Sequence, residues 1–132
     1  METHLVNARV LVVDDHAAHA EGMAELLALK GFKTKPTTSG TEALKLVTDW
    51  KPDAVLTDLG LPDLSGFEIC RRIRSNPAWN TVAVIFHTGS QPHPGHPTEC
   101  DAFLTYPVET STLVATVTGS IMRRWNRLSE SR

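Results

Sequence analysis

Three short, nearly continuous apolar runs constrain the fold of this chain more than any other feature of its sequence. They are residues 9–13, 53–57 and 82–86. Runs of this kind, rich in β-branched residues, are typical of strands that are buried on both faces of a parallel sheet. The first run ends abruptly at Asp14 and Asp15, and the second ends at Asp58. Three acidic side chains are therefore expected where buried strands end.

The segments between these runs carry helical patterns. Apolar residues recur at helical spacing over 17–30 and are followed by Gly31, a typical C-terminal cap. Ser39 to Glu42 and Ser65 to Glu68 both have the form of a capping box, which predicts that a helix begins at each. A last helix is predicted from an apolar stripe that continues almost to the C-terminus. The stripe consists of Leu113, Val117, Ile121, Trp125 and Leu128.

Two weaker strands complete an alternating pattern. Residues 32–38 contain Pro36, which suits a strand at the edge of a sheet, and residues 102–105 form a short apolar run. Five strands that alternate with about five helical segments predict an α/β fold with a doubly wound, parallel sheet. Residues 90–98 hold three prolines and a glycine, so we expect mainly loop there, with at most one helical turn near 98–101.

Length and charge narrow the class of protein. With 132 residues, the chain is predicted to be one domain, 1–132, with its core at about 7–128. The net charge of −2 gives no overall basic field, so binding to nucleic acid or to a membrane surface is not expected. Two cysteines and a first segment unlike a secretory signal favour a reduced, cytoplasmic protein.

The strand-end acids suggest a chemistry. In doubly wound folds the ligand site lies at the carboxyl ends of the strands, which would gather Asp14, Asp15, Asp58 and Thr88. Converging carboxylates repel one another unless a cation lies among them, and oxygen ligands suit Mg²⁺. Such a site favours phosphoryl transfer with an aspartate as the nucleophile. The alternative is that these acids are only solvated caps of the strands.

The ordered motifs resemble the receiver domain of bacterial two-component response regulators. They are VVDDH at 12–16, DLGLPDLSG at 58–66, Thr88-Gly89 and FLTYP at 103–107. The resemblance covers residues 7 to 128, and it implies a flavodoxin-like sheet, a signalling rather than an enzymatic role, and a sensor histidine kinase or phosphotransfer protein as the donor. It also implies a downstream target protein.

The resemblance further implies a role for each matching residue. Asp58 would accept the phosphoryl group, while Asp14, Asp15 and Asp58, with the backbone carbonyl of Gly60, would hold Mg²⁺. Thr88 would move to bind the new phosphate. Phe103, at the position of the aromatic switch in the family, would turn inward with it, although an ordinary core role for this residue is an equal alternative.

Two departures from the family pattern stand out. Tyr106 occupies the position directly before the proline where the family carries a lysine, and losing a preorganised charged donor costs about 3–4 kcal/mol of transition-state stabilisation. Phosphorylation would then be slower, uncoupled from switching, or absent. The second departure is the segment rich in proline and histidine, which predicts a shortened or missing fourth helix and a rebuilt output surface.

Other functions stay open on the sequence alone. The first is a pseudo-receiver that binds proteins without phosphorylation, and the second is a metal-dependent phosphatase, which would need a second acid where His16 stands. His87, His93, His96 and Cys100 are loosely spaced like ligands of a soft metal ion. Because few residues follow the last helix, a stand-alone module that acts through another protein is expected.

Overall fold

Five strands and four α-helices make up the part of the chain that the structure describes. The computed structural model describes residues 7–89 and 100–130, and it gives only the backbone of 127–130. The strands are β1 (Arg9–Val13), β2 (Lys33–Thr37), β3 (Ala54–Thr57), β4 (Ala83–Thr88) and β5 (Ala102–Thr105). The helices are α1 (Ala17–Leu29), α2 (Gly40–Asp49), α3 (Gly66–Arg74) and α4 (Thr110–Glu130), with a 3-10 turn at Pro77–Trp79.

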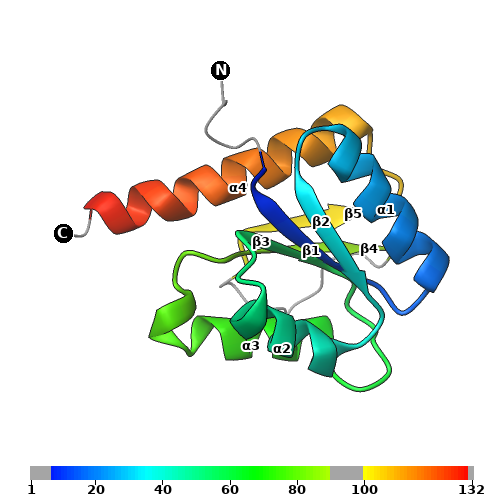
Figure 1. Ribbon diagram of the computed structural model, residues 1–132, viewed down its shortest axis with the longest axis horizontal. Coiled ribbons are helices and arrows are strands. Elements are labelled where there is room, and N and C mark those ends of the chain that lie inside the picture. The colour runs from blue at the N-terminus through cyan, green and yellow to red at the C-terminus, as the bar shows by residue number, and fades with distance from the viewer. Residues whose placement is uncertain (1–6, 90–99, 131–132) are drawn as a thin grey trace.

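All five strands are parallel and form one sheet in the order β2-β1-β3-β4-β5 (Figure 1). The predicted doubly wound α/β fold is confirmed. β2 lies at one edge, as its proline predicted, because Pro36 has no backbone N–H and pairs only with Val12 of β1. The carboxyl ends of β1, β3 and β4 meet at one edge of the sheet, where parallel topology places ligand sites.

Two hydrophobic layers cover the two faces of the sheet. In β1, Val10 and Val12 pack with residues of α1 and α4, whereas Leu11 and Val13 pack with residues of α2 and α3. Figure 1 shows these helix pairs on opposite sides of the sheet. Successive side chains of a strand point to opposite faces, so a central strand between two helical layers has to be apolar throughout.

Local signals set the helix ends as expected. The hydroxyl of Ser39 accepts a hydrogen bond from the backbone N–H of Glu42, and that of Ser65 accepts one from Glu68, each at 3.1 Å. Gly31, after α1, has a φ of 104°, a conformation that glycine adopts without strain. α3 stops at Arg74, and the side chain of Asn76 begins the 3-10 turn by accepting a hydrogen bond from Ala78 N.

The last helix buries the predicted stripe against the sheet. Leu113, Val117 and Ile121 of α4 are fully buried, and Trp125 packs at the margin of the same layer. Leu128 lies in α4, but its side chain is outside the described residues.

Between β4 and β5, the described residues contain no helix, which agrees with a shortened or missing fourth helix.

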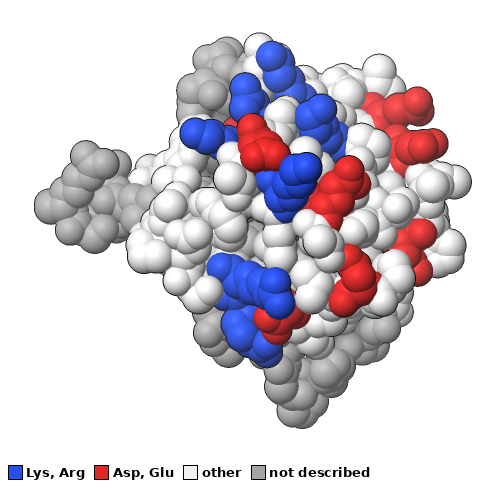
Figure 2. All heavy atoms as spheres, turned by 60° about the horizontal axis from the view of Figure 1, so that its bottom comes forward, with Lys and Arg blue, Asp and Glu red and all other residues white. Residues whose placement is uncertain are grey.

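No described helix combines the length and the apolar character needed to cross a membrane. Figure 2 shows basic and acidic side chains interleaved on the face that it presents, with acidic side chains gathered along one margin. That view contains no continuous field of one charge.

Candidate functional site

The three predicted acids do converge at the carboxyl edge of the sheet. Asp14 and Asp15 directly follow β1, and Asp58 directly follows β3; one carboxylate oxygen from each lies within 4.8 Å of the others. Asp14 is buried, Asp58 is half-buried and Asp15 is exposed. The site thus has one carboxylate at its base and two that solvent can reach, and its all-oxygen composition suits a hard cation such as Mg²⁺.

Backbone hydrogen bonds fix the bases of Asp14 and Asp58. The N–H of Asp14 donates to the carbonyl of Thr37 at 3.1 Å, and the N–H of Asp58 donates to the carbonyl of Val13 at 3.0 Å. Each side chain then accepts a local bond: Asp14 from His16 N at 2.9 Å, and Asp58 from Leu59 N at 2.7 Å. The two acids therefore point toward each other because neighbouring strands hold them in register.

Tyr106 closes the site from the end of β5. Its hydroxyl donates a hydrogen bond to Oδ2 of Asp14 at 3.2 Å, and its backbone N–H donates to the carbonyl of Thr88 at 2.9 Å. The peptide bond between Tyr106 and Pro107 is cis. Burial, and then the negative charges of Asp58 and Asp14, raise the pKa of the Tyr106 phenol well above its usual value near 10. At neutral pH this residue is a neutral donor.

Thr88 and Phe103 lie on adjacent strands beside the site. Thr88 is buried as the last residue of β4 and pairs with Thr105 of β5. Phe103 is half-buried, and its ring contacts that of Phe86 edge to face, with centroids 5.7 Å apart. The structure places both residues where the sequence predicted; their movement as switch residues stays a prediction.

The loop after Asp58 runs very close to the start of α3. Gly66 N donates to the carbonyl of Leu59 at 2.8 Å, and a Cβ on Gly66 would lie 2.4 Å from the carbonyl oxygen of Asp58. Only glycine allows this approach without a shift of the backbone. Gly60 lies in the same loop and is exposed; its carbonyl as a metal ligand stays a prediction.

Two histidines lie near the acids: His87, which follows the apolar run 82–86 at the carboxyl edge of the sheet, and His19, which the sequence did not single out. His19, in the first turn of α1, has its Nδ1 3.4 Å from Oδ2 of Asp14, and its ring contacts that of Tyr106. His87 of β4 packs against the Tyr106 ring, with centroids 4.3 Å apart. Helical spacing places His19 one turn into α1, but only the tertiary structure shows that this turn faces Asp14.

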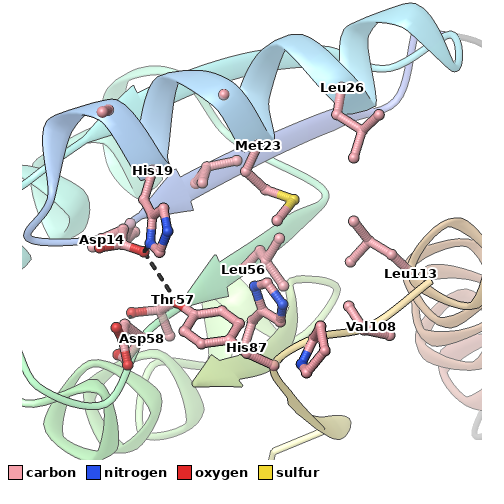
Figure 3. Close-up of a pocket in the computed structure, with 16 residues that line it drawn as sticks. Asp14, His19, Met23, Leu26, Leu56, Thr57, Asp58, His87, Val108 and Leu113 are labelled. Carbon is pink, nitrogen blue, oxygen red and sulfur yellow. Dashed lines mark hydrogen bonds and ion pairs between the residues drawn. The ribbon is translucent and has the colours of Figure 1, made fainter. Parts of the chain in front are cut away.

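A cavity of about 460 Å³ extends from the acids between α1 and the start of α4 (Figure 3). Its polar end holds Asp14, Asp58 and His87, and its walls farther along include Met23 and Leu113. Burial lowers the pKa of His87, although Asp58 and Asp14 act in the opposite direction. Nε2 of His87 has no hydrogen-bond partner among the described residues. The imidazole is therefore held neutral beside the site.

His16 is the N-cap residue of α1, and its side chain does not cap the helix. It lies at the rim of the site, with Nδ1 3.1 Å from Oδ1 of Asp15. The soft-metal site predicted from His87, His93, His96 and Cys100 stays a prediction, because His93 and His96 lie outside the described residues. Of that set, Cys100 is half-buried and His87 belongs to the cavity.

Comparison with known proteins gives a consistent result. The family described as response regulator receiver domain matches residues 10–118. A DNA-binding response regulator, MtrA, from Mycolicibacterium paratuberculosis is 34% identical over 116 residues, which are 87% of this chain and 52% of that protein. The chain thus spans about half the length of this relative, and the DNA binding in its name is said of the longer protein.

Solved structures show the same architecture. A response regulator receiver domain protein from Clostridium thermocellum has a TM-score of 0.77 and 28% identity, with 89% of this chain and 96% of that chain covered. A CheY-like receiver domain from Methylobacillus flagellatus has a TM-score of 0.76 and 30% identity, with coverage of 84% and 96%. These similarities extend over nearly the whole described chain.

Proposed function

Because the chain belongs to the response regulator receiver domain family of two-component signalling, we propose that Asp58 is its phosphoacceptor. The donor is the phosphohistidine of a sensor histidine kinase or of a phosphotransfer protein. One observation supports this more than any other: the half-buried Asp58 carboxylate lies with those of Asp14 and Asp15 at the carboxyl edge of the sheet, within 4.8 Å. The family consists of signalling domains, and we propose no turnover of a substrate.

The transfer step follows from the placement of Asp58. A carboxylate oxygen of Asp58 attacks phosphorus, a P–O bond forms and the P–N bond to the donor imidazole breaks. The product is an acyl phosphate on Asp58, and the departing imidazole takes up a proton from solvent. The hydrogen bond from Leu59 N to Oδ1 holds the carboxylate in one orientation, which leaves Oδ2 as the attacking atom.

The acidic cluster fits Mg²⁺, because its donors are all oxygen. Asp14, Asp15 and Asp58 would hold the ion, with the carbonyl of Gly60 as a further ligand. When bound, Mg²⁺ supplies positive charge that offsets the negative charge of the phosphoryl oxygens. Asp14 contributes a fixed, buried carboxylate, since backbone and side-chain hydrogen bonds hold it from three directions.

The output of the site would pass through Thr88 and Phe103. The Thr88 side chain would form a hydrogen bond with the new phosphate. Phe103, on the adjacent strand, would turn inward as Thr88 moves. A downstream protein would then read the changed surface around β5 and α4. The half-buried state of Phe103 supports this proposal, since a ring at the margin of the core has room for two positions.

One observation favours a second candidate function, a pseudo-receiver that binds partners without phosphorylation. Tyr106 stands where the family has lysine, and its hydroxyl is engaged with Asp14 rather than offered to a phosphate. A neutral phenol supplies one hydrogen bond and no charge. The barrier to phosphorylation would rise by about 3–4 kcal/mol if no other cation replaced the ammonium.

Intact mass spectrometry separates the two candidates. The wild-type chain, Asp58→Asn and Tyr106→Lys are incubated with Mg²⁺ and acetyl phosphate, and the mass of each is followed in time. A phosphoryl group on the wild type that Asp58→Asn cannot accept is the expected result. If Tyr106→Lys alone is modified, the pseudo-receiver is correct. If Asp58→Asn is modified like the wild type, Asp58 is not the acceptor.

A further inference from the structure

We propose that His16 and His19, together with the carboxylate of Asp14, form a binding site for a transition metal ion such as Zn²⁺. The two histidines lie at the start of α1, one as its N-cap and the other in its first turn. One ligand atom from each of the three side chains lies within 4.8 Å of the others. This site shares Asp14 with the acidic cluster but draws its nitrogen donors from a different element.

The spacing of the donor atoms fits a tetrahedral ion. Nδ1 of His16 is 3.5 Å from Oδ1 of Asp14, and Nδ1 of His19 is 3.4 Å from Oδ2 of the same carboxylate. Zn²⁺ binds nitrogen and oxygen at 2.0–2.2 Å, so neighbouring ligands in a tetrahedron are separated by about 3.4 Å. Each histidine thus lies at about this spacing from one of the two Asp14 oxygens. With one atom taken from each residue, the three donors lie within 4.8 Å of one another, so the two exposed rings have to draw closer to a single oxygen when the ion binds.

The exposure of the two rings suits metal binding. The side chains of His16 and His19 are 75% and 64% exposed, whereas that of Asp14 is 10% exposed. An ion bound through Nδ1 leaves the other ring nitrogen, Nε2, protonated and free to donate to water. Asp15, whose Oδ1 is 3.1 Å from Nδ1 of His16, is near enough to serve as a fourth ligand.

The chemistry of the donors decides which ion is favoured. Mg²⁺ takes oxygen ligands, whereas neutral imidazole prefers Zn²⁺, Cu²⁺ or Ni²⁺. Addition of two imidazoles to one carboxylate thus creates a site with a selectivity opposite to that of the three acids. Because both sites use Asp14, an ion held by the histidines competes with Mg²⁺ for that carboxylate. This inference needs no phosphorylation of Asp58.

Calorimetric titration with ZnCl₂ tests the site on the full chain without an affinity tag. The wild type is compared with the double variant His16→Asn/His19→Asn and with the matched control His93→Asn/His96→Asn, which removes two histidines of the segment outside the described residues. We expect one Zn²⁺ per wild-type chain and the same affinity in the control. In the double variant the affinity should fall by a factor of about 100 or more.

Visible absorption with Co²⁺ supplies a second measurement, because a tetrahedral ion absorbs far more strongly than an octahedral one. The intense bands are expected in the wild type and the control and should be absent in the double variant. Because the side chains of His16 and His19 are exposed, the double variant at these two positions should unfold at the same temperature as the wild type. Three outcomes would overturn the proposal: no Zn²⁺ binding by the wild type, full affinity in the double variant, or loss of affinity in the control.

Asp58→Asn distinguishes this proposal from that of the previous subsection. This variant should keep its Zn²⁺ affinity within a few-fold of the wild type even though it accepts no phosphoryl group. If Zn²⁺ affinity falls as far in Asp58→Asn as in the double variant, the ion binds at the three acids and the histidine site is wrong. Failure of phosphorylation in the wild type leaves the Zn²⁺ result unaffected.

Discussion

The phenol of Tyr106 donates a hydrogen bond to the buried carboxylate of Asp14, across 3.2 Å and 92 positions of sequence. The bond joins the end of β5 to the end of β1 directly above the site. An ammonium in the place of this phenol would be drawn to the same negative charge, whereas the neutral phenol cannot offset it. The departure from the family at one residue therefore puts a neutral hydroxyl, and not a positive charge, beside the Asp14 carboxylate.

Titration of Tyr106 tests this relationship. The chain has a single tyrosine, so tyrosinate absorbance reports on this residue alone. Its pKa is raised in the folded protein, first by burial and then by Asp58 and Asp14. We expect no ionisation as the pH passes 10 in the folded chain, and ionisation near 10 in urea.

Stability should follow the same titration. Above pH 10 the unfolded state loses the proton that the folded state retains, so the free energy of unfolding falls as the pH rises further. The contribution is complete below pH 10. A folded chain whose tyrosine titrates near 10 would contradict the environment described here, and Asp14→Asn, which removes one of the negative charges, should lower the pKa of Tyr106.

His87 should make stability depend on pH on the acidic side, whereas Tyr106 does so on the alkaline side. Burial lowers its pKa in the folded state, so as the pH falls through about 6.5 the unfolded chain takes up a proton before the folded chain does. Stability is complete above that pH and decreases below it. Urea unfolding at several pH values between about 5 and 7 should give a smaller slope for His87→Gln than for the wild type.

The carboxyl groups of the chain contribute equally to the pH dependence of stability in the wild type and in His87→Gln. The difference between the two slopes therefore reports on His87. Equal slopes for wild type and variant would show that the imidazole is not held neutral. A proton NMR titration of the ring gives an independent value, which should lie below the usual one.

Asp101 should be essential for stability although it lies away from the site. Its Oδ1 accepts from Arg124 of α4 at 2.8 Å, and its Oδ2 accepts from Arg74 of α3 at 2.9 Å and from Val84 N at 2.8 Å. All three side chains are about nine-tenths buried. Asp101→Ala leaves two buried guanidinium groups without their carboxylate, so unfolding should become easier by about 3–5 kcal/mol.

Chemical denaturation measures this change, with an exposed ion pair as the control. Glu68 contacts Arg71 and Arg72 on the surface of α3. Glu68→Gln should alter the free energy of unfolding by less than about 1 kcal/mol. Similar small effects for both variants would show that the buried network does not join α3, β4 and α4 energetically.

Gly66 should tolerate no side chain. In Gly66→Ala the new Cβ meets the carbonyl oxygen of Asp58 at 2.4 Å, so α3 or the loop after β3 has to shift. We expect a loss of about 1–3 kcal/mol in thermal or chemical unfolding. Because the shift displaces the backbone of Asp58, the rate of phosphorylation by acetyl phosphate should fall as well.

Gly22 provides the matched control for Gly66. It lies on an exposed part of α1, and a Cβ there would meet nothing within 4 Å. Gly22→Ala should therefore stabilise the chain by about 0.5–1 kcal/mol, since alanine is the better helix former. If both alanine variants changed stability in the same direction, the close approach at Gly66 would not be the cause.

The elements of this fold were predictable because local physics sets them. Apolar runs mark β1, β3 and β4, capping boxes mark the starts of α2 and α3, and Pro36 marks the edge strand. Parallel topology then brings the acids after β1 and β3 to one edge, which is why the convergence of Asp14, Asp15 and Asp58 could be predicted.

Contacts between distant segments were decided only by the tertiary structure. The sequence singled out Tyr106 as a departure, but the packing of β5 beside β4 decides that its hydroxyl reaches Asp14. Likewise, the pitch of α1 turns His19 toward the same carboxylate, and the burial of Arg74 and Arg124 around Asp101 follows from how α3 and α4 cover the sheet. Such contacts depend on the three-dimensional positions of side chains, which no periodicity or spacing in the sequence encodes.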